Sequence, residues 1–294
     1  MEEHSWLTEQ FEENRGHLRA VAYRMLGSLS EADDAVQETW LRLSRSDASQ
    51  IGNLGGWLTT VVSRVCLDML RSRTSRKEDA LEVEPGIPDT QAGTDPEQET
   101  VMADRVGLAL MVVLDRLAPA ERLAFILHDV FAVSFDEIAS ILGRSADAAR
   151  QLATRARRRI QGAPTISRPD LTQQREVANA FLTALRAGDF EGLMAVLDPD
   201  VVVRVDAAAA RPGPPREIRG AQNWAKGAIA FSRHVSIRGV QPMLVDGEVG
   251  LVWAPRGRLS RVLRLSMKAG KIATVNVIAD PAALEQLELA VLND

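Results

Sequence analysis

Arginine is concentrated in one short segment of this chain, GRSADAARQLATRARRRI (residues 143–160), where Asp147 is the only acidic residue. The chain as a whole carries a formal net charge of −5, so its composition does not explain this concentration. At about 100° per residue, Ala149, Leu152 and Ile160 fall on one face of a helix and arginines on the other. Guanidinium groups bind phosphates and the edges of bases, so the segment predicts nucleic-acid binding. The alternative is a solvated basic face that complements the helix dipole.

The residues before this segment have the outline of a helix-turn-helix. Ser134 can cap the helix FDEIASIL, Gly143 can end it in a left-handed conformation, and Ser145 can cap the arginine helix. In such a motif the second helix enters the major groove of DNA, which favours the nucleic-acid interpretation. The candidate DNA contacts here are Arg144, Ser145, Arg150, Gln151, Thr154, Arg155 and Arg158.

The N-terminal part has apolar residues at helical spacing from Leu7 to Arg73, which predicts a helical domain over residues 1–77. Ser30 is the expected N-cap of the helix EADDAVQETWLRL, which has acids in its first turn and Arg42 near its end. An acidic patch with an apolar anchor suits a basic protein partner, although acids at a helix start are also ordinary. The candidate partner-binding residues are Asp33, Asp34, Gln37, Glu38, Trp40 and Leu41.

Residues 78–104 contain nine acidic residues and no basic residue. This stretch is also interrupted by prolines and glycines and has few aliphatic side chains, so it cannot bury enough apolar surface to fold by itself. We expect an extended linker between the N-terminal domain and a second helical domain over residues 105–162.

Residues 7–160 resemble the two-domain core of an extracytoplasmic-function sigma factor of bacterial RNA polymerase. ADDAVQETWLRL (32–43) is similar to the segment that docks on the polymerase clamp helices, and NLGGWLTTVVSRVCLDMLRSR (53–73) to the segment that melts and reads the minus-10 element. LDRLAPAERLAFILHDVFAVSFDEIASILGRSADAARQLATRARRRI (114–160) is similar to the domain that reads the minus-35 element. The resemblance implies core RNA polymerase and promoter DNA as partners, and a linker that threads polymerase channels. It adds Asn53, Trp57, Arg64, Arg71 and Arg73 as DNA contacts, although the family often has asparagine at the position of Arg64.

The C-terminal part follows a short linker, residues 163–169, and has a different texture. Helical patterns over 172–187, 190–197 and 224–231, a strand at 201–206, four strand-like runs within 235–280 and a last helix from Pro281 predict an α+β domain over 170–294. The order resembles the cone-shaped fold of SnoaL-like and nuclear-transport-factor-like proteins, which often encloses a pocket. The local pocket candidates are Asp206, Trp224, His234 and Trp253. Because such isolated residues are more often turn or core residues, we expect no catalysis.

The sequence thus predicts two all-α sigma domains followed by an α+β domain that regulates them in cis. A DNA-binding module fused to a ligand-sensing or enzymatic SnoaL-like domain, and a helix-turn-helix repressor that never binds polymerase, stay open as alternatives. The absence of a long apolar run indicates a cytoplasmic chain without a membrane partner. One cysteine and four scattered histidines indicate neither a disulfide nor a metal site, and we expect no cofactor.

Overall fold

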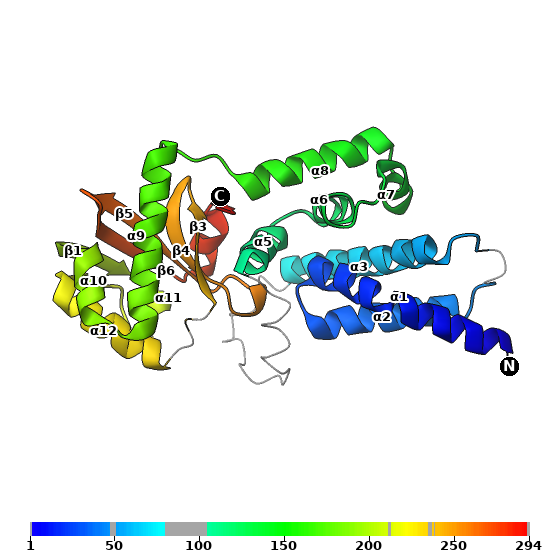
Figure 1. The fold of residues 1–294 in the computed structure, drawn as a ribbon, viewed down its shortest axis with the longest axis horizontal. Helices are drawn as coiled ribbons and strands as arrows, with labels where there is room; N and C mark the ends of the chain where they lie inside the picture. Colours follow the sequence, from blue (N-terminus) through cyan, green and yellow to red (C-terminus); the bar gives the residue numbers. More distant parts are fainter. Residues whose placement is uncertain are drawn as a thin grey trace. The chain divides into compact units, whose positions relative to one another are not determined.

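The computed structural model describes residues 2–47, 51–79, 105–210, 213–234, 237 and 239–292. They form two compact units, which are described separately (Figure 1). The first contains the N-terminal helices and Leu114–Arg158, and the second contains α5 (Arg105–Asp115) as far as Val113 and the chain from Arg159 onward. The predicted linker lies outside the described residues, apart from Glu78 and Asp79, which belong to a helix. In the described part of the chain, no helix is long and apolar enough to span a membrane.

The first unit begins with three helices that pack on one another, α1 (Glu2–Leu26), α2 (Leu29–Leu43) and α3 (Leu54–Asp79). The apolar residues that recur at helical spacing are buried between them, including Leu18, Val21, Met25, Leu43, Leu58 and Val62. The prediction that Ser30 caps the second helix is wrong. Ser28 is the N-cap, because its hydroxyl accepts the N–H of Glu31, three residues ahead, at 3.5 Å.

The remaining helices of this unit are α6 (Pro119–Phe125), the π-helix η3 (Ile126–Val130), α7 (Phe135–Leu142) and most of α8 (Ala146–Gln161). The predicted helix-turn-helix signals are confirmed. Ser134 forms a capping box with Glu137, Gly143 ends α7 at φ 64°, and the Ser145 hydroxyl accepts the N–H of Ala148 at 3.2 Å. These local signals fix the turn that presents α8.

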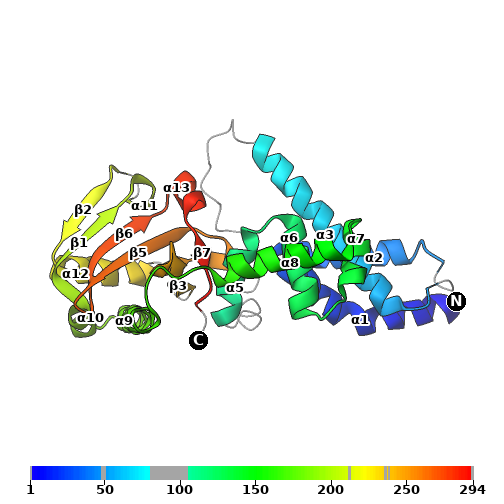
Figure 2. The same ribbon diagram turned by 90° about the horizontal axis from the view of Figure 1, so that it is seen from above.

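The second unit is built on one mixed sheet, in the order β2-β1-β6-β5-β4-β3-β7 (Figure 2). The strands are β1 (Leu197–Val205), β2 (Arg216–Arg219), β3 (Val240–Val245), β4 (Glu248–Trp253), β5 (Arg261–Lys268), β6 (Lys271–Ile278) and β7 (Leu289–Ala290). All neighbours are antiparallel except β1 and β6. The predicted α+β class is confirmed, and the sequence patterns missed only the short edge strands β2 and β7 among these.

Three helices pack against this sheet, α9 (Arg168–Ala187), α10 (Phe190–Val196) and α12 (Ala221–His234). The helix α9 crosses β3 and β4, whereas α12 lies against β1 and β2. Two short helices, α11 (Ala207–Ala210) and α13 (Pro281–Gln286), and the 3-10 turn η4 (Pro255–Gly257) complete the unit. The core lies between the sheet and the helices, where Phe181, Leu193, Val203 and Leu251 are buried.

Candidate functional site

The helix α8 has the two faces that its sequence predicts. Its alanine-rich side is buried, and this side comprises Ala149, Leu152, Ala153, Ala156 and Ile160. On the opposite side Arg150, Gln151, Arg155 and Arg158 are exposed, and Thr154 is half-buried with its hydroxyl donating to the carbonyl of Arg150. An alanine face allows close packing of the helix, while the long side chains on the other face project outward, as DNA reading requires.

The exposed arginines of α8 differ in the side chains that their guanidinium groups contact. Arg150 donates to Asp147 at 2.6 Å, and its guanidinium lies 5.2 Å from the centre of the Phe135 ring. Arg155 donates from Nε to Glu121 at 2.9 Å, and Glu121 is only 7% exposed. Among the described residues, Arg158 has no side-chain partner. Arg155 therefore contributes to the stability of the fold by pairing with Glu121, whereas the guanidinium of Arg158 is available to bind a phosphate.

The second predicted DNA-binding segment lies at the start of α3 and along it. Asn53 is exposed and caps α3, its Oδ1 accepting the N–H of Gly56 at 3.0 Å, and Trp57 is half-buried. Arg64 donates to the carbonyl of Ser140 at 3.1 Å, and the exposed Arg71 lies 3.8 Å from Asp68.

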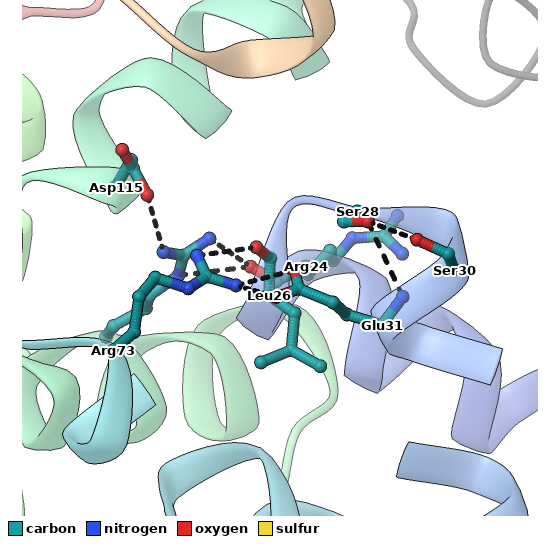
Figure 3. Close-up of polar contacts among 8 residues, drawn as sticks. Arg24, Leu26, Ser28, Ser30, Glu31, Arg73 and Asp115 are labelled. Atoms are coloured by element: carbon teal, nitrogen blue, oxygen red, sulfur yellow. Dashed lines mark hydrogen bonds and ion pairs between the residues drawn. The ribbon is translucent and has the colours of Figure 1, made fainter. Parts of the chain in front are cut away.

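Arg73, the last of the predicted contacts in α3, is engaged inside the fold. Its Nη2 donates to both carboxylate oxygens of Glu31, at 2.6 and 2.5 Å, and its Nη1 to the carbonyl of Leu26 at 3.4 Å (Figure 3). These bonds tie α3 to α2 and to the C-terminal end of α1. A guanidinium at this end also complements the negative end of the helix dipole.

The predicted partner-binding residues form the outer side of α2. Asp33 pairs with Arg19 at 2.7 Å and Glu38 pairs with Arg42 at 2.9 Å. Asp34 and Gln37 are exposed, and neither has a polar side-chain partner among the described residues. The apolar anchor is also present, since Leu41 is 38% exposed and Trp40 packs on Phe11 with 5.0 Å between the ring centres.

The four candidates for a pocket in the C-terminal domain have different surroundings. Asp206 is a structural acceptor: its Oδ1 accepts the N–H of Ala209 at 2.7 Å, and its Oδ2 accepts those of Ala279 and Asp280 at 2.7 and 2.9 Å. Trp224 and Trp253 are partly buried and pack against the core of the sheet domain. His234 ends α12, and its side chain lies outside the described part.

The sequence patterns did not predict the burial of one charged residue. Arg122 in α6 is only 2% exposed, and it donates to the carbonyl of Arg24 and to Asp115. The only signal for it was a charged pair, Glu121 and Arg122, in the otherwise apolar run of α6, and such a pair is usually solvated.

Comparisons with known proteins show which families and relatives this chain is similar to. Residues 10–76 match Sigma-70 region 2, and residues 107–160 match Sigma-70, region 4. The ECF RNA polymerase sigma factor SigJ of Mycobacterium tuberculosis is 37% identical over 287 residues, which cover 92% of this chain and 91% of SigJ. Probable ECF RNA polymerase sigma factor SigI of the same species is 33% identical over 296 residues, 98% of each chain. The crystal structure of SigJ covers 94% of this chain and 97% of its own, with 34% identity and a TM-score of 0.47.

The two matched regions have the order and the elements that the sequence predicts, with the three helices first and the helix-turn-helix after them. The similarity to SigJ and SigI extends through the α+β domain to nearly the whole length of each relative. The chain therefore belongs to the extracytoplasmic-function sigma factors, and it is an alternative sigma factor that binds core RNA polymerase and promoter DNA to direct transcription.

Proposed function

We propose that the exposed side of α8 reads the upstream promoter element, with Gln151 and Arg150 at base edges and Arg158 on phosphates. Asp147 and the Phe135 ring support this assignment for Arg150, because they hold its guanidinium before DNA arrives. A side chain that is already ordered loses less entropy on binding. The exposed side of α2, with Asp34, Gln37 and Leu41, is the proposed surface for core polymerase, in the cytoplasm where promoters are transcribed.

The C-terminal domain is proposed to regulate this activity in cis, without chemistry of its own. The observation that supports this proposal is that the C-terminal domain is hydrogen-bonded to the last turn of α8. Within the second unit, Val291 donates its N–H to the carbonyl of Ile160, in the last turn of α8, at 2.8 Å. Five residues later, beyond the end of α8, Thr165 donates its N–H to the carbonyl of Gly247 at 3.0 Å. The C-terminal domain therefore holds the last turn of the helix that carries the proposed reading residues.

Gly162 is the tightest point of this junction. Its φ is +62°, in the region that favours glycine, and a Cβ at this position would overlap the Cβ of Ala290 in β7. The end of α8 and the sheet edge are thus in close contact at this point. The opposite role, an enzymatic tail, gets no support from Asp206, since backbone N–H groups already occupy both of its carboxylate oxygens.

The junction offers a matched test in the full-length chain. Gly162→Ala should change the transcript yield from a cognate promoter at least threefold, because the new methyl group forces the tail and the helix end apart. Gly188→Ala is the control, since Gly188 also ends a helix with positive φ, +68°, but its nearest neighbour, Ile229, is 4.0 Å away. Ala290→Gly in the Gly162→Ala background should restore the yield. Equal yields for the two single variants would mean that the junction does not regulate transcription.

A further inference from the structure

One buried hydrogen-bond donor of the C-terminal domain has no acceptor among the described residues. Trp224 lies near the start of α12, and its Nε1–H is shielded from solvent without making a hydrogen bond in the described part of the chain. A buried N–H without an acceptor costs free energy, so nearly all such groups in folded proteins are paired with protein, water or a ligand. Trp224 as a whole is half-buried, so this donor lies close to the accessible surface of its own ring.

An arginine held by two aromatic rings lies near the other end of α12. The guanidinium of Arg261 in β5 lies 5.2 Å from the centre of the Phe231 ring and 5.5 Å from that of Trp253. Trp253 is also the direct partner of Arg261 in the pairing of β4 with β5. A guanidinium that stacks on rings presents its N–H groups at the edge of its plane, which is the geometry that binds a carboxylate through two hydrogen bonds. Phe231 is 42% exposed, so solvent reaches this place.

The inner face of the sheet is not fully covered beside this arginine. Leu263 in β5 is paired with Val277 in β6 and with Leu251 in β4, and directly paired residues share one face of a sheet. Both partners are buried, at 6% and 0% exposure, whereas Leu263 between them keeps part of its surface in contact with solvent. The helices therefore leave apolar surface on this face that a ligand can cover favourably.

The unpaired donor and the guanidinium face the same side of α12. Trp224 and Phe231 are seven residues apart, which at about 100° per residue is close to two full turns. At 1.5 Å per residue they are separated by about 10.5 Å along the helix axis. A molecule lying along this side of α12 would meet an N–H donor at one end, the guanidinium of Arg261 at the other, and apolar surface between them.

We propose that α12 and the inner face of the sheet bind an elongated aromatic carboxylate. Its acid group binds Arg261, and an oxygen at its far end accepts the indole N–H of Trp224. Aromatic rings suit the middle, because Phe231, Trp253 and Leu263 offer aromatic and aliphatic surface. Every residue involved belongs to the second unit. The inference goes beyond the proposed regulation in cis and does not depend on it, because binding is measured without transcription.

The probe is a biphenyl with a carboxylate at one para end and a hydroxyl group at the other. Calorimetric titration of the full-length chain should give a Kd below about 1 mM. The corresponding carboxamide, which carries no charge, should bind at least tenfold more weakly. The analogue with a methyl group in place of the hydroxyl should bind at least threefold more weakly. These measurements use the unaltered chain, so they decide the proposal even where a variant fails to fold.

Three variants assign the two ends of the probe. Arg261→Gln should weaken binding of the probe at least tenfold. Arg264→Gln is the matched control and should leave the Kd unchanged, because Arg264 lies on the same strand but on the opposite face of the sheet, where it pairs with Asp246 at 3.3 Å. Trp224→Phe keeps a ring without the N–H and should abolish the preference for the hydroxyl over the methyl analogue.

Four results would each overturn the proposal. These are no binding below about 1 mM, equal binding of the carboxylate and the carboxamide, equal losses in the two arginine variants, and a hydroxyl preference that survives Trp224→Phe.

Discussion

Replacing Arg155 by alanine should show how much this residue contributes to stability through Glu121 and how much it contributes to DNA binding. The substitution leaves Glu121, 7% exposed, without the guanidinium that lies 2.9 Å from it. Breaking a fully buried pair costs about 3–5 kcal/mol. The Arg155 side chain is 53% exposed, however, so water reaches one side of the pair. We therefore expect a smaller loss of stability, about 1–3 kcal/mol, as for a buried polar group that loses one of its hydrogen-bond partners.

Urea denaturation of the full-length chain measures this loss, and Arg158→Ala is the matched control. Arg158 lies on the same exposed face without a side-chain partner among the described residues, so its removal should change stability by less than about 0.5 kcal/mol. In promoter binding both variants should weaken affinity, and each should reduce the salt slope by about 1 if it removes one phosphate contact. Arg155→Lys should recover part of the stability because it keeps the charge.

The reasoning fails if Arg155→Ala and Arg158→Ala unfold at the same urea concentration. That result would mean that Glu121 does not depend on Arg155. A loss of stability without any loss of promoter binding would instead confine Arg155 to the fold and remove it from the reading face.

Three further outcomes are expected. Asp34→Arg should weaken core polymerase binding at least threefold in a pull-down without moving the thermal midpoint, and unchanged binding would remove Asp34 from the docking surface. Asp206→Ala should cost about 2–3 kcal/mol in urea denaturation, since three backbone N–H groups lose their acceptor, and a neutral effect would contradict that role. Burial raises the pKa of Cys66 to about 12, so its thiol should react with Ellman's reagent at pH 8 far more slowly than in urea. Because this folded-state pKa is above the unfolded value, the stability contributed by the neutral thiol should be lost as pH rises from about 9 through 12, and rapid labelling of the native chain would refute it.

Much of the reading helix was determined by the sequence alone. The cap at Ser134, the glycine at 143, the cap at Ser145 and the two faces of α8 depend on hydrogen bonds and spacings within a few residues, so they can be predicted from neighbours in the chain. The prediction of the α2 cap was wrong although this signal is also local. Two serines, Ser28 and Ser30, precede the helix, and only Ser28 accepts the N–H of the residue three positions ahead.

Only the tertiary structure decided which charges are available and which are engaged. Arg73, Arg122 and Arg155 look alike in the sequence, but their partners Glu31, Arg24 and Glu121 lie 34 to 98 residues away along the chain. The junction at Gly162 also depends on a strand more than 120 residues later. Periodicity reports which side of a helix is apolar, but it carries no information about which distant carbonyl or carboxylate will meet a given guanidinium. That choice is made by packing, because a buried charge must find its partner among whatever the fold brings near.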